Sequence, residues 1–394
     1  MKIAQVAPLC EAVPPKLYGG TEMVIAHLCD ALTELGHEVT LFASAESSTE
    51  ARLVPMRDHS LRLDAVPLKS DLAAHLSMLY EVRELSQRFD ILHFHLDLLH
   101  FPLFEHLAHR CVTTVHSRTD LKDLPGAYAR WPYYGLVSIS DRQRHPLPDA
   151  NWLATVPHGI SPARYWCSGH ADRGYLAFLG RIAPEKGPDV AIRLAREARI
   201  PLRIAAKVDA ADRVYFESVI RPLLDDPLIE FIGEIGAEQK PEFLANALAL
   251  LFPIRWPEPF GLVMIEAMAC GTPVIAWDRG SVPEVIEPGV TGFVVQSDRQ
   301  ALAAIREVER LDRRAVRAAF ERRFTARHMA GAYLDVIEAF EIPVRAMTSF
   351  SIAFTDGLWQ YMDGCTIAAN PRAGVLEKGA TQYTACGLSL VHFC

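Results

Sequence analysis

The sequence lacks the features that would place the protein among disulfide-stapled, zinc-binding or membrane-spanning classes. Its 394 residues include 8 cysteines, but none of these stand in the CxxC or CxxxC spacing of a metal knuckle. Isolated cysteines of this kind are typical of reduced thiols in a cytosol. No run of about eighteen apolar residues is present, so we expect no transmembrane segment. The opening residues, Met1 to Ala7, are typical of a strand and not of a signal peptide, which favours a cytoplasmic protein.

An excess of basic residues is also lacking. Lys and Arg number 40 against 48 Asp and Glu, which gives a net charge of −8 and an isoelectric point near 6.0. Proteins that bind nucleic acids usually carry a basic balance, so we expect no nucleic-acid partner. The length is sufficient for two domains of ordinary size with a sizeable core.

The most informative stretch that is present runs from Pro257 to Gly271. Every residue but one from Leu262 to Cys270 is apolar, which predicts a helix buried on all sides and ended by Gly271. The exception is Glu266. A buried carboxylate without a donor costs several kcal/mol or loses its charge. No Lys or Arg lies within a turn of Glu266, so its partner is either distant in the sequence or a ligand hydroxyl.

The segment before this helix, Trp256 to Gly261, contains two prolines and a glycine and is predicted to be irregular. It brings Glu258 and the first free backbone N–H groups of the helix to one place. Helix N-termini of this kind favour anions, and phosphate above all. The pattern indicates a phosphorylated, hydroxyl-rich ligand. The alternative is a core helix in which Glu266 meets a distant arginine.

The beginning of the chain predicts a Rossmann-like unit. A strand from Ile3 to Ala7 precedes a Pro- and Gly-rich loop, a helix that Thr21 caps and that runs to Leu35, and a strand from Glu38 to Ala43. The pair Gly19-Gly20 would let the backbone approach a ligand closely, or would simply form a tight turn. The full GxGxxG of a dinucleotide site is lacking.

A second series of strands, loops and helices begins at Tyr175. Arg181 and Lys186 flank a glycine-bounded turn after its first strand, where two cations suit a pyrophosphate. The alternative for them is a pair of solvated surface charges. The predicted fold class is α/β, with two Rossmann-like, doubly wound parallel-sheet domains. The predicted organisation is an N-terminal domain over 1–160, a linker over 161–173, a C-terminal domain over 174–325, a closing helix over 326–340, and a tail of unknown structure over 341–394.

Two other patterns admit a functional interpretation. His93, His95 and Asp97 resemble the ligand run of some metallohydrolases. However, Leu98 stands where a further histidine is expected, and satisfied polar groups near a strand end are the alternative. Six arginines between residues 313 and 327 would allow peripheral contact with an anionic membrane or a substrate, whereas a solvated helix face paired with acids is the ordinary alternative.

Over roughly residues 1 to 340 the chain resembles the retaining GT-B glycosyltransferases of family four. Its opening, its interdomain signature, its phosphate loop and its paired glutamates are all similar to the motifs of that family. These motifs are Gly19-Gly20-Thr21-Glu22 with Gly36-His37-Glu38-Val39-Thr40-Leu41, Val156-Pro157-His158-Gly159-Ile160, Gly180-Arg181 with Glu185-Lys186-Gly187, and Glu258-Pro259-Phe260-Gly261 with Glu266. Ser161 departs from the pattern, because an acid is frequent there in the family.

The resemblance implies a role for each of these residues. Arg181 and Lys186 would hold the donor diphosphate, and Glu266 would accept hydrogen bonds from the ribose. Glu258 would lie by the donor sugar, and His116 would line the sugar side near the anomeric carbon. The backbone N–H groups of Phe260, Gly261 and Leu262 would face phosphate or sugar oxygens, and Gly19 and Gly20 would approach the phosphates. No metal is implied, and retention would proceed by front-face attack.

The implied activity is transfer of a hexose from a nucleoside-diphosphate sugar, with UDP-glucose favoured, to a hydroxyl acceptor such as a sugar, a pterin or another small molecule. The stretches Ala4 to Leu9 and Ile254 to Gly261 are similar to a subgroup described as UDP-glucose:tetrahydrobiopterin glucosyltransferases. The alternatives are a GT-B epimerase or phosphorylase and a non-catalytic module that binds a sugar nucleotide. Oligomeric state is not indicated by the sequence.

Overall fold

The computed structural model describes residues 1–66, 69–167 and 174–348, together with short strands between 352 and 392. The chain divides into two compact units, Met1–Phe340 and Glu341–Cys394. Residues 168–173 of the predicted linker lie outside the described residues. Among the described residues, no helix combines the length and the apolarity needed to cross a bilayer.

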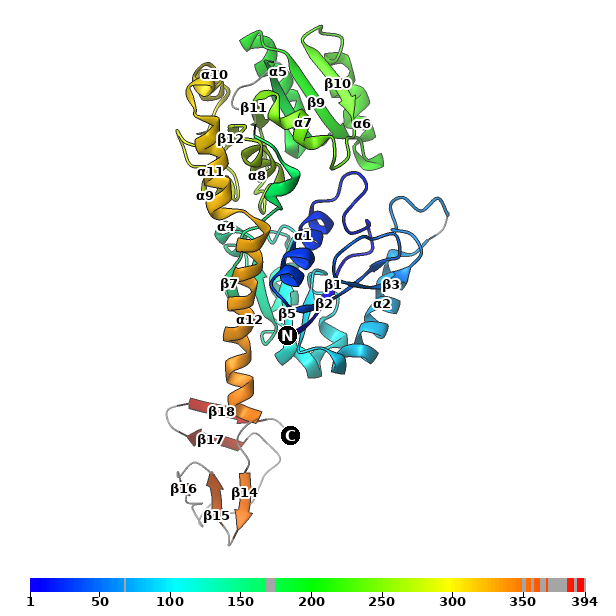
Figure 1. Cartoon of the computed structure of the whole chain (residues 1–394), viewed down its shortest axis with the longest axis vertical. Helices are drawn as coiled ribbons and strands as arrows, with labels where there is room; N and C mark the ends of the chain where they lie inside the picture. The colour runs from blue at the N-terminus through cyan, green and yellow to red at the C-terminus, as the bar shows by residue number, and fades with distance from the viewer. Residues whose placement is uncertain are drawn as a thin grey trace. The chain divides into compact units, whose positions relative to one another are not determined.

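The N-terminal half of the first unit is built on a seven-stranded parallel sheet with the order β3-β2-β1-β4-β5-β6-β7 (Figure 1). Its central strands are buried on both faces, which explains their near-continuous apolar sequence. The strands are β1 (Lys2–Val6), β2 (Glu38–Ser44), β3 (Arg52–Arg57), β4 (Ile91–Phe94), β5 (Cys111–Thr114), β6 (Gly135–Ser138) and β7 (Trp152–Thr155). The helices of this half are α1 (Gly20–Glu34), α2 (Asp71–Leu85), α3 (Leu124–Tyr128) and α4 (Asp141–Arg144).

The C-terminal half contains a six-stranded parallel sheet with the order β10-β9-β8-β11-β12-β13. The strands are β8 (Tyr175–Arg181), β9 (Leu202–Lys207), β10 (Ile229–Gly233), β11 (Ala247–Phe252), β12 (Val274–Trp277) and β13 (Gly292–Val295). The helices are α5 (Pro188–Ala198), α6 (Arg213–Tyr215), α7 (Lys240–Ala245), α8 (Leu262–Ala269), α9 (Val282–Val285), α10 (Asp298–Glu307) and α11 (Arg313–Arg323). Two doubly wound sheets of this kind confirm the predicted fold class.

The chain returns to the N-terminal half through α12 (Ala326–Thr348), which Figure 1 shows beside that half. Met329, Tyr333 and Ile337 of this helix are buried in the same core cluster as Val24 of α1 and Val112 of β5. The helix begins where the closing helix is predicted but runs past residue 340. The halves are therefore joined both by the linker and by the closing helix.

After the end of α12, the remaining described residues are strands. Three of them, β14 (Ile352–Thr355), β15 (Leu358–Tyr361) and β16 (Thr366–Ile367), form an antiparallel sheet. A second antiparallel pair consists of β17 (Thr381–Ala385) and β18 (Leu388–His392). No strand was predicted in this segment, because its sequence shows no convincing periodicity.

Two local features differ from the expectations. Helix α1 begins at Gly20 with Gly19 as its N-cap residue and no side-chain cap, so the prediction that Thr21 caps it is wrong. A Cβ atom at Gly19 would lie 2.8 Å from Cβ of Pro15, which explains why glycine precedes this helix. The arginines near the end of the C-terminal half form a solvated face only in part, because Arg314, Arg322 and Arg327 are exposed but Arg313 is buried. Arg313 donates to the carbonyl oxygen of Ala247, which lies 66 positions earlier in the chain. Arg317 donates to the carbonyl oxygen of Tyr165, which lies 152 positions earlier.

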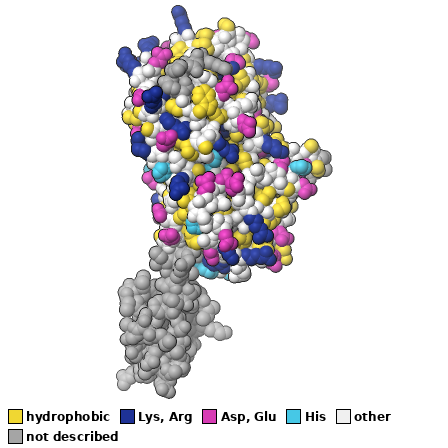
Figure 2. Space-filling view, in the orientation of Figure 1, with side chains coloured by type: hydrophobic (Ala, Val, Ile, Leu, Met, Phe, Trp, Pro, Cys, Tyr) yellow, Lys and Arg dark blue, Asp and Glu magenta, His cyan; other side chains and the backbone are white. Residues whose placement is uncertain are grey.

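Charged side chains of both signs are interspersed over the face of the first unit that Figure 2 shows. Most of the arginines have acidic or carbonyl partners close by. Arg323, for example, donates to Oε1 of Glu287 at 2.8 Å. This arrangement favours the ordinary reading of the arginine cluster as scaffold and surface ion pairs.

Gly159 lies where the linker passes the start of the closing helix, and we predict that it tolerates no side chain. A Cβ atom there would overlap the carbonyl oxygen of Thr325 and lie 3.0 Å from Cβ of Met329. The substitution Gly159→Ala should therefore lower the free energy of unfolding by about 2 kcal/mol or more. Gly331→Ala is the matched control, because a Cβ at Gly331 meets nothing within 4 Å. It should raise stability by up to about 1 kcal/mol. Urea denaturation measures both, and a Gly159→Ala protein as stable as the parent would contradict the packing described.

Candidate active site

A cavity of about 360 Å³ is lined by residues of both halves. All the residues predicted to bind or transform the ligand line it: Gly19, Gly20, His116, Arg181, Lys186, Glu258, Phe260, Gly261, Leu262 and Glu266. They come from loops at the carboxyl ends of parallel strands and from the start of α8, where α/β folds form their ligand sites. The structure thus brings together residues that are up to 247 positions apart, but their individual roles remain predictions.

The cationic loop follows β8. Lys186 ends a turn of 3-10 helix, and Gly187 has φ 68°, in the left-handed region. A Cβ at Gly187 would overlap the carbonyl oxygen of Pro253, so glycine is required for the loop to lie against β11. Lys186 Nζ lies 2.5 Å from Oε2 of Glu258 and 4.7 Å from the centre of the Trp256 ring. The loop therefore delivers its lysine to the glutamate-containing segment.

Arg181 is surrounded by carboxylates. It donates to Oε1 of Glu185, and its other nitrogens lie 3.7 Å from Oδ2 of Asp209 and 3.5 Å from Oδ2 of Asp212. Its side chain is one-third exposed. The two cations are thus directed toward the cavity and held by acids, which differs from solvated surface charges.

The segment around Glu258 is held from several sides. Trp256 Nε1 donates to Oε2 of Glu258 at 2.8 Å, and the backbone N–H of Ser281 donates to Glu258 O at 2.9 Å. Gly280 packs so closely that a Cβ there would overlap the backbone of Glu258. Glu258 is therefore fixed in position before any ligand binds.

Glu266 is fully buried on α8. The sequence predicted either a partner distant in the chain or a ligand hydroxyl, and the structure shows a distant partner. Oε1 accepts from Nζ of Lys240 at 2.8 Å and from the hydroxyl of Tyr165 at 3.1 Å. The alternative of a distant arginine is right in that a distant protein cation holds Glu266, but that cation is the lysine Lys240. Oε2 has no hydrogen-bond partner among the described residues, and Glu266 lines the cavity. A buried carboxylate oxygen without a partner is costly unless a ligand supplies the donor.

Tyr165 stays a hydrogen-bond donor in this arrangement. Burial, and next the charge of Glu266, raise the pKa of its hydroxyl well above the ordinary value of 10.0. Tyr165 belongs to the segment between the halves, so one donor to the buried acid comes from the linker.

The backbone at the start of α8 also faces the cavity. Gly261 has φ 80°, and a Cβ there would lie 2.9 Å from Cε of Met264 and 3.0 Å from Cζ of Phe252. Only glycine suits this turn, and it presents the first free N–H groups of the helix to the space between the cations and Glu266.

His116 belongs to a row of histidines in which its neighbours His95 and His158 are buried. Nε2 of His95 lies 2.8 Å from Oε1 of Gln5, so it carries a hydrogen, and Nδ1 of His95 is then an acceptor. Nε2 of His116 lies 2.8 Å from that Nδ1 and must donate to it. Nδ1 of His116 is consequently a bare acceptor, and it has no partner among the described residues. Burial lowers the pKa of His116 to about 3, so the ring stays neutral.

The metallohydrolase hypothesis receives no support from this geometry. His93 Nε2 faces Thr114 Oγ1 at 2.8 Å, and Asp97 accepts from Ser117 Oγ at 2.7 Å. Within residues 1–66, 69–167 and 174–340, no group of three or more His, Cys, Asp or Glu side chains is arranged to hold a metal ion. The alternative of satisfied polar groups holds only in part, because His93 Nδ1 and Asp97 Oδ1 have no hydrogen-bond partner among the described residues.

Several residues that line the cavity or hold Glu266 were not predicted. Lys240 and Tyr165 carry no local pattern, because only the tertiary fold brings them to Glu266. Lys207 could have been found, since it stands at the carboxyl end of β9 beside Arg181 at the end of β8. Trp256 and Arg118 also line the cavity, and the guanidinium carbon of Arg118 lies 5.3 Å from the centre of the Trp256 ring.

Two family models match the chain. The one described as Glycosyltransferase Family 4 matches residues 18–151, and the one described as Glycosyl transferases group 1 matches residues 168–322. The chain belongs to the family 4 glycosyltransferases. The family that the motifs indicated is thereby confirmed. As a member of this family, the protein is a glycosyltransferase that uses a nucleoside-diphosphate sugar.

Relatives with assigned activities point the same way. The D-inositol 3-phosphate glycosyltransferase of Rhodococcus erythropolis is 29% identical over 343 residues, which covers 71% of this chain and 76% of the relative. That of Nocardia farcinica is 34% identical over 176 residues, 39% of this chain and 38% of its own length.

Solved structures share the fold. AviGT4, a glycosyltransferase involved in avilamycin A biosynthesis, has a TM-score of 0.67 and 25% identity and covers 86% of this chain and 97% of its own. Anabaena HepE in complex with UDP and glucose has a TM-score of 0.68 and 17% identity, and covers 86% of this chain and all of its own.

Because several histidines have a lowered pKa in the folded protein, we predict that the free energy of unfolding decreases as the pH falls below 6.5. Burial lowers the pKa of His27, His93 and His116 to about 3, against an ordinary value of 6.5. The unfolded chain therefore binds more protons below pH 6.5, so stability present above that value is lost as the pH falls toward 3. A His116→Asn protein should lose less stability between pH 6 and pH 4, by about 1.4 kcal/mol per pH unit in urea denaturation. An unchanged slope would mean that His116 is already charged in the folded protein.

Proposed function

We propose that the protein transfers a hexose from a UDP-sugar, with UDP-glucose favoured, to a hydroxyl group of a small polyol. The transfer retains the anomeric configuration and requires no metal ion. The single observation that carries the proposal is that a buried carboxylate and two cationic side chains line one cavity. Glu266, one of whose carboxylate oxygens has no partner among the described residues, lines the same cavity as Arg181 and Lys186.

The donor would bind along the C-terminal half. Oε2 of Glu266 would accept hydrogen bonds from the ribose, which removes the cost of its burial without a donor. Arg181, Lys186 and the first N–H groups of α8 would hold the diphosphate. These groups would stabilise the charge that develops on the leaving phosphate, the work that a metal ion performs in other transferases.

The sugar would lie between the halves. Glu258 is fixed by Lys186 and Trp256, and its carboxylate would accept from sugar hydroxyls. His116 lines the cavity, and its unpartnered Nδ1 would accept a hydrogen bond from a hydroxyl of the same sugar. In front-face transfer, the acceptor hydroxyl forms the new bond on the side that the phosphate leaves. A phosphate oxygen then takes the acceptor proton.

The acceptor would bind against the N-terminal half. The relatives that act on D-inositol 3-phosphate make inositol and its 3-phosphate the first acceptors to test. Tetrahydrobiopterin and simple sugars follow, because the subgroup resemblance includes a pterin acceptor. Acceptor pockets are built from variable loops, so a panel is needed.

The experiment incubates the purified protein with UDP-glucose and each acceptor, with and without EDTA. Release of UDP that depends on the acceptor, an α-linked product by NMR and insensitivity to EDTA are the expected results. A changed sugar without acceptor would indicate an epimerase, and sugar phosphate formed with inorganic phosphate would indicate a phosphorylase. Tight UDP binding without turnover in any mixture would indicate a binding module.

The substitution Glu266→Gln should raise the KM for UDP-glucose at least tenfold, because it removes the charged acceptor for the ribose and leaves Lys240 without its anion. Glu238→Gln is the matched control, since Glu238 is an exposed acid in the same half. Its steady-state kinetics should equal those of the parent. If Glu266→Gln also leaves KM and kcat unchanged while the fold is intact, the ribose role of Glu266 is wrong.

A further inference from the structure

Lys207 is a cavity residue to which the family motifs assign no role. It ends β9 and pairs in register with Arg181 at the end of β8, so the two cations stand on neighbouring parallel strands at the same edge of the sheet. Its side chain is 12% exposed and lines the cavity. A largely buried lysine at this edge needs an anion.

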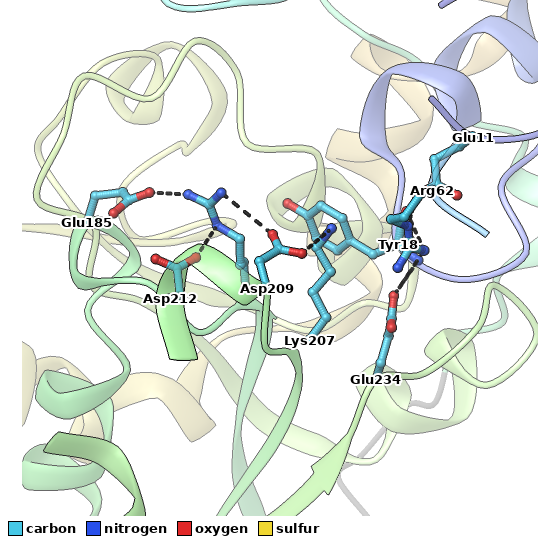
Figure 3. Close-up of polar contacts among 9 residues, drawn as sticks. Glu11, Tyr18, Arg62, Glu185, Lys207, Asp209, Asp212 and Glu234 are labelled. Atoms are coloured by element: carbon cyan, nitrogen blue, oxygen red, sulfur yellow. Dashed lines mark hydrogen bonds and ion pairs between the residues drawn. The ribbon is translucent and has the colours of Figure 1, made fainter. Parts of the chain in front are cut away.

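Asp209 lies between the two cations (Figure 3). Its Oδ1 is 3.1 Å from Nζ of Lys207, and its Oδ2 is 3.7 Å from Nη1 of Arg181. One carboxylate therefore offers one oxygen to each cation, as two oxygens of a phosphate group would. Glu185 and Asp212 also lie beside Arg181, so three carboxylates face these two cations.

The other half of the molecule reaches the same lysine. Nζ of Lys207 lies 4.7 Å from the centre of the Tyr18 ring, and Tyr18 directly precedes Gly19-Gly20. The Tyr18 backbone is held in turn, because its N–H donates to Oε1 of Glu234 at 2.9 Å and its carbonyl accepts from Nη2 of Arg62 at 3.3 Å (Figure 3). A cation over an aromatic face is attracted to it. Lys207 is thus positioned by both halves.

We propose that Lys207 is a third cation for the donor diphosphate, and that Asp209 occupies the place of a phosphate between Lys207 and Arg181 until the donor displaces it. This inference rests on the proposed function. The exchange replaces one anion by another, so neither cation becomes unpaired in a buried place. A diphosphate carries more negative charge than a carboxylate and can displace it, whereas an uncharged nucleoside cannot.

The test measures binding of UDP, inorganic pyrophosphate and uridine to the full chain by calorimetry. Asp209→Asn keeps the shape of the side chain but removes the competing charge, so UDP and pyrophosphate should bind about fivefold or more tightly. Lys207→Met should weaken both about tenfold, and Lys207→Arg should restore most of the affinity. Uridine should bind equally to all variants, since it carries no phosphate.

Asp298→Asn is the matched control for net charge, because it removes an acid paired with Arg193 at 2.6 Å that does not line the cavity. Its UDP affinity should equal that of the parent, and melting temperatures confirm that each variant is folded. Weaker UDP binding by Asp209→Asn, or unchanged UDP binding by a folded Lys207→Met protein, would overturn the inference. Pyrophosphate binding that follows the expected order without any UDP binding would sustain the inference and reject the nucleotide donor. A parent protein that binds neither ligand would reject both.

Discussion

The structure depends on how a fully buried carboxylate is held at the edge of a cavity. Glu266 is held at one oxygen by Lys240 and Tyr165, and its other oxygen is left without a donor among the described residues. A lysine and a tyrosine fix the carboxylate in position, and the second oxygen is the part that a ligand must satisfy. The first turn of α8 and the cationic loop surround the same cavity, so this one residue relates the buried core of the C-terminal half to its ligand site.

The hydrogen bond from Tyr165 to Glu266 connects the proposed nucleotide site to the segment between the halves. Tyr165 lies in the segment that leads from one half to the other, and α12 packs its apolar face into the core of the N-terminal half. Tyr165 is packed in the core cluster of the C-terminal half, so this donor to Glu266 lies beside the joint. Tyr18 and Lys207 form a second connection across the cavity. Closure that excludes water and favours transfer over hydrolysis would use both connections.

Much of this could be predicted from the sequence. The two sheets follow from alternating strand and helix patterns, and the apolar run around Glu266 marked the buried acid because an isolated charge stands out among apolar neighbours. The partners of that acid could not be predicted, since Lys240 and Tyr165 lie 26 and 101 positions away and nothing local marks them. Thr21 was expected to cap α1 from its residue type, but the close approach of Pro15 places Gly19 there instead. Position at a strand end could have identified Lys207.

The most direct test of the central claim is a calorimetric comparison of UDP with 2′,3′-dideoxy-UDP on the unaltered protein. The two ligands carry the same base and diphosphate and differ only in the ribose hydroxyls that Glu266 is proposed to accept. Because a hydrogen bond to a charged group contributes about 1.5–3 kcal/mol, we expect the dideoxy ligand to bind at least tenfold more weakly. Equal affinity for the two ligands would contradict the assignment of Glu266 to the ribose.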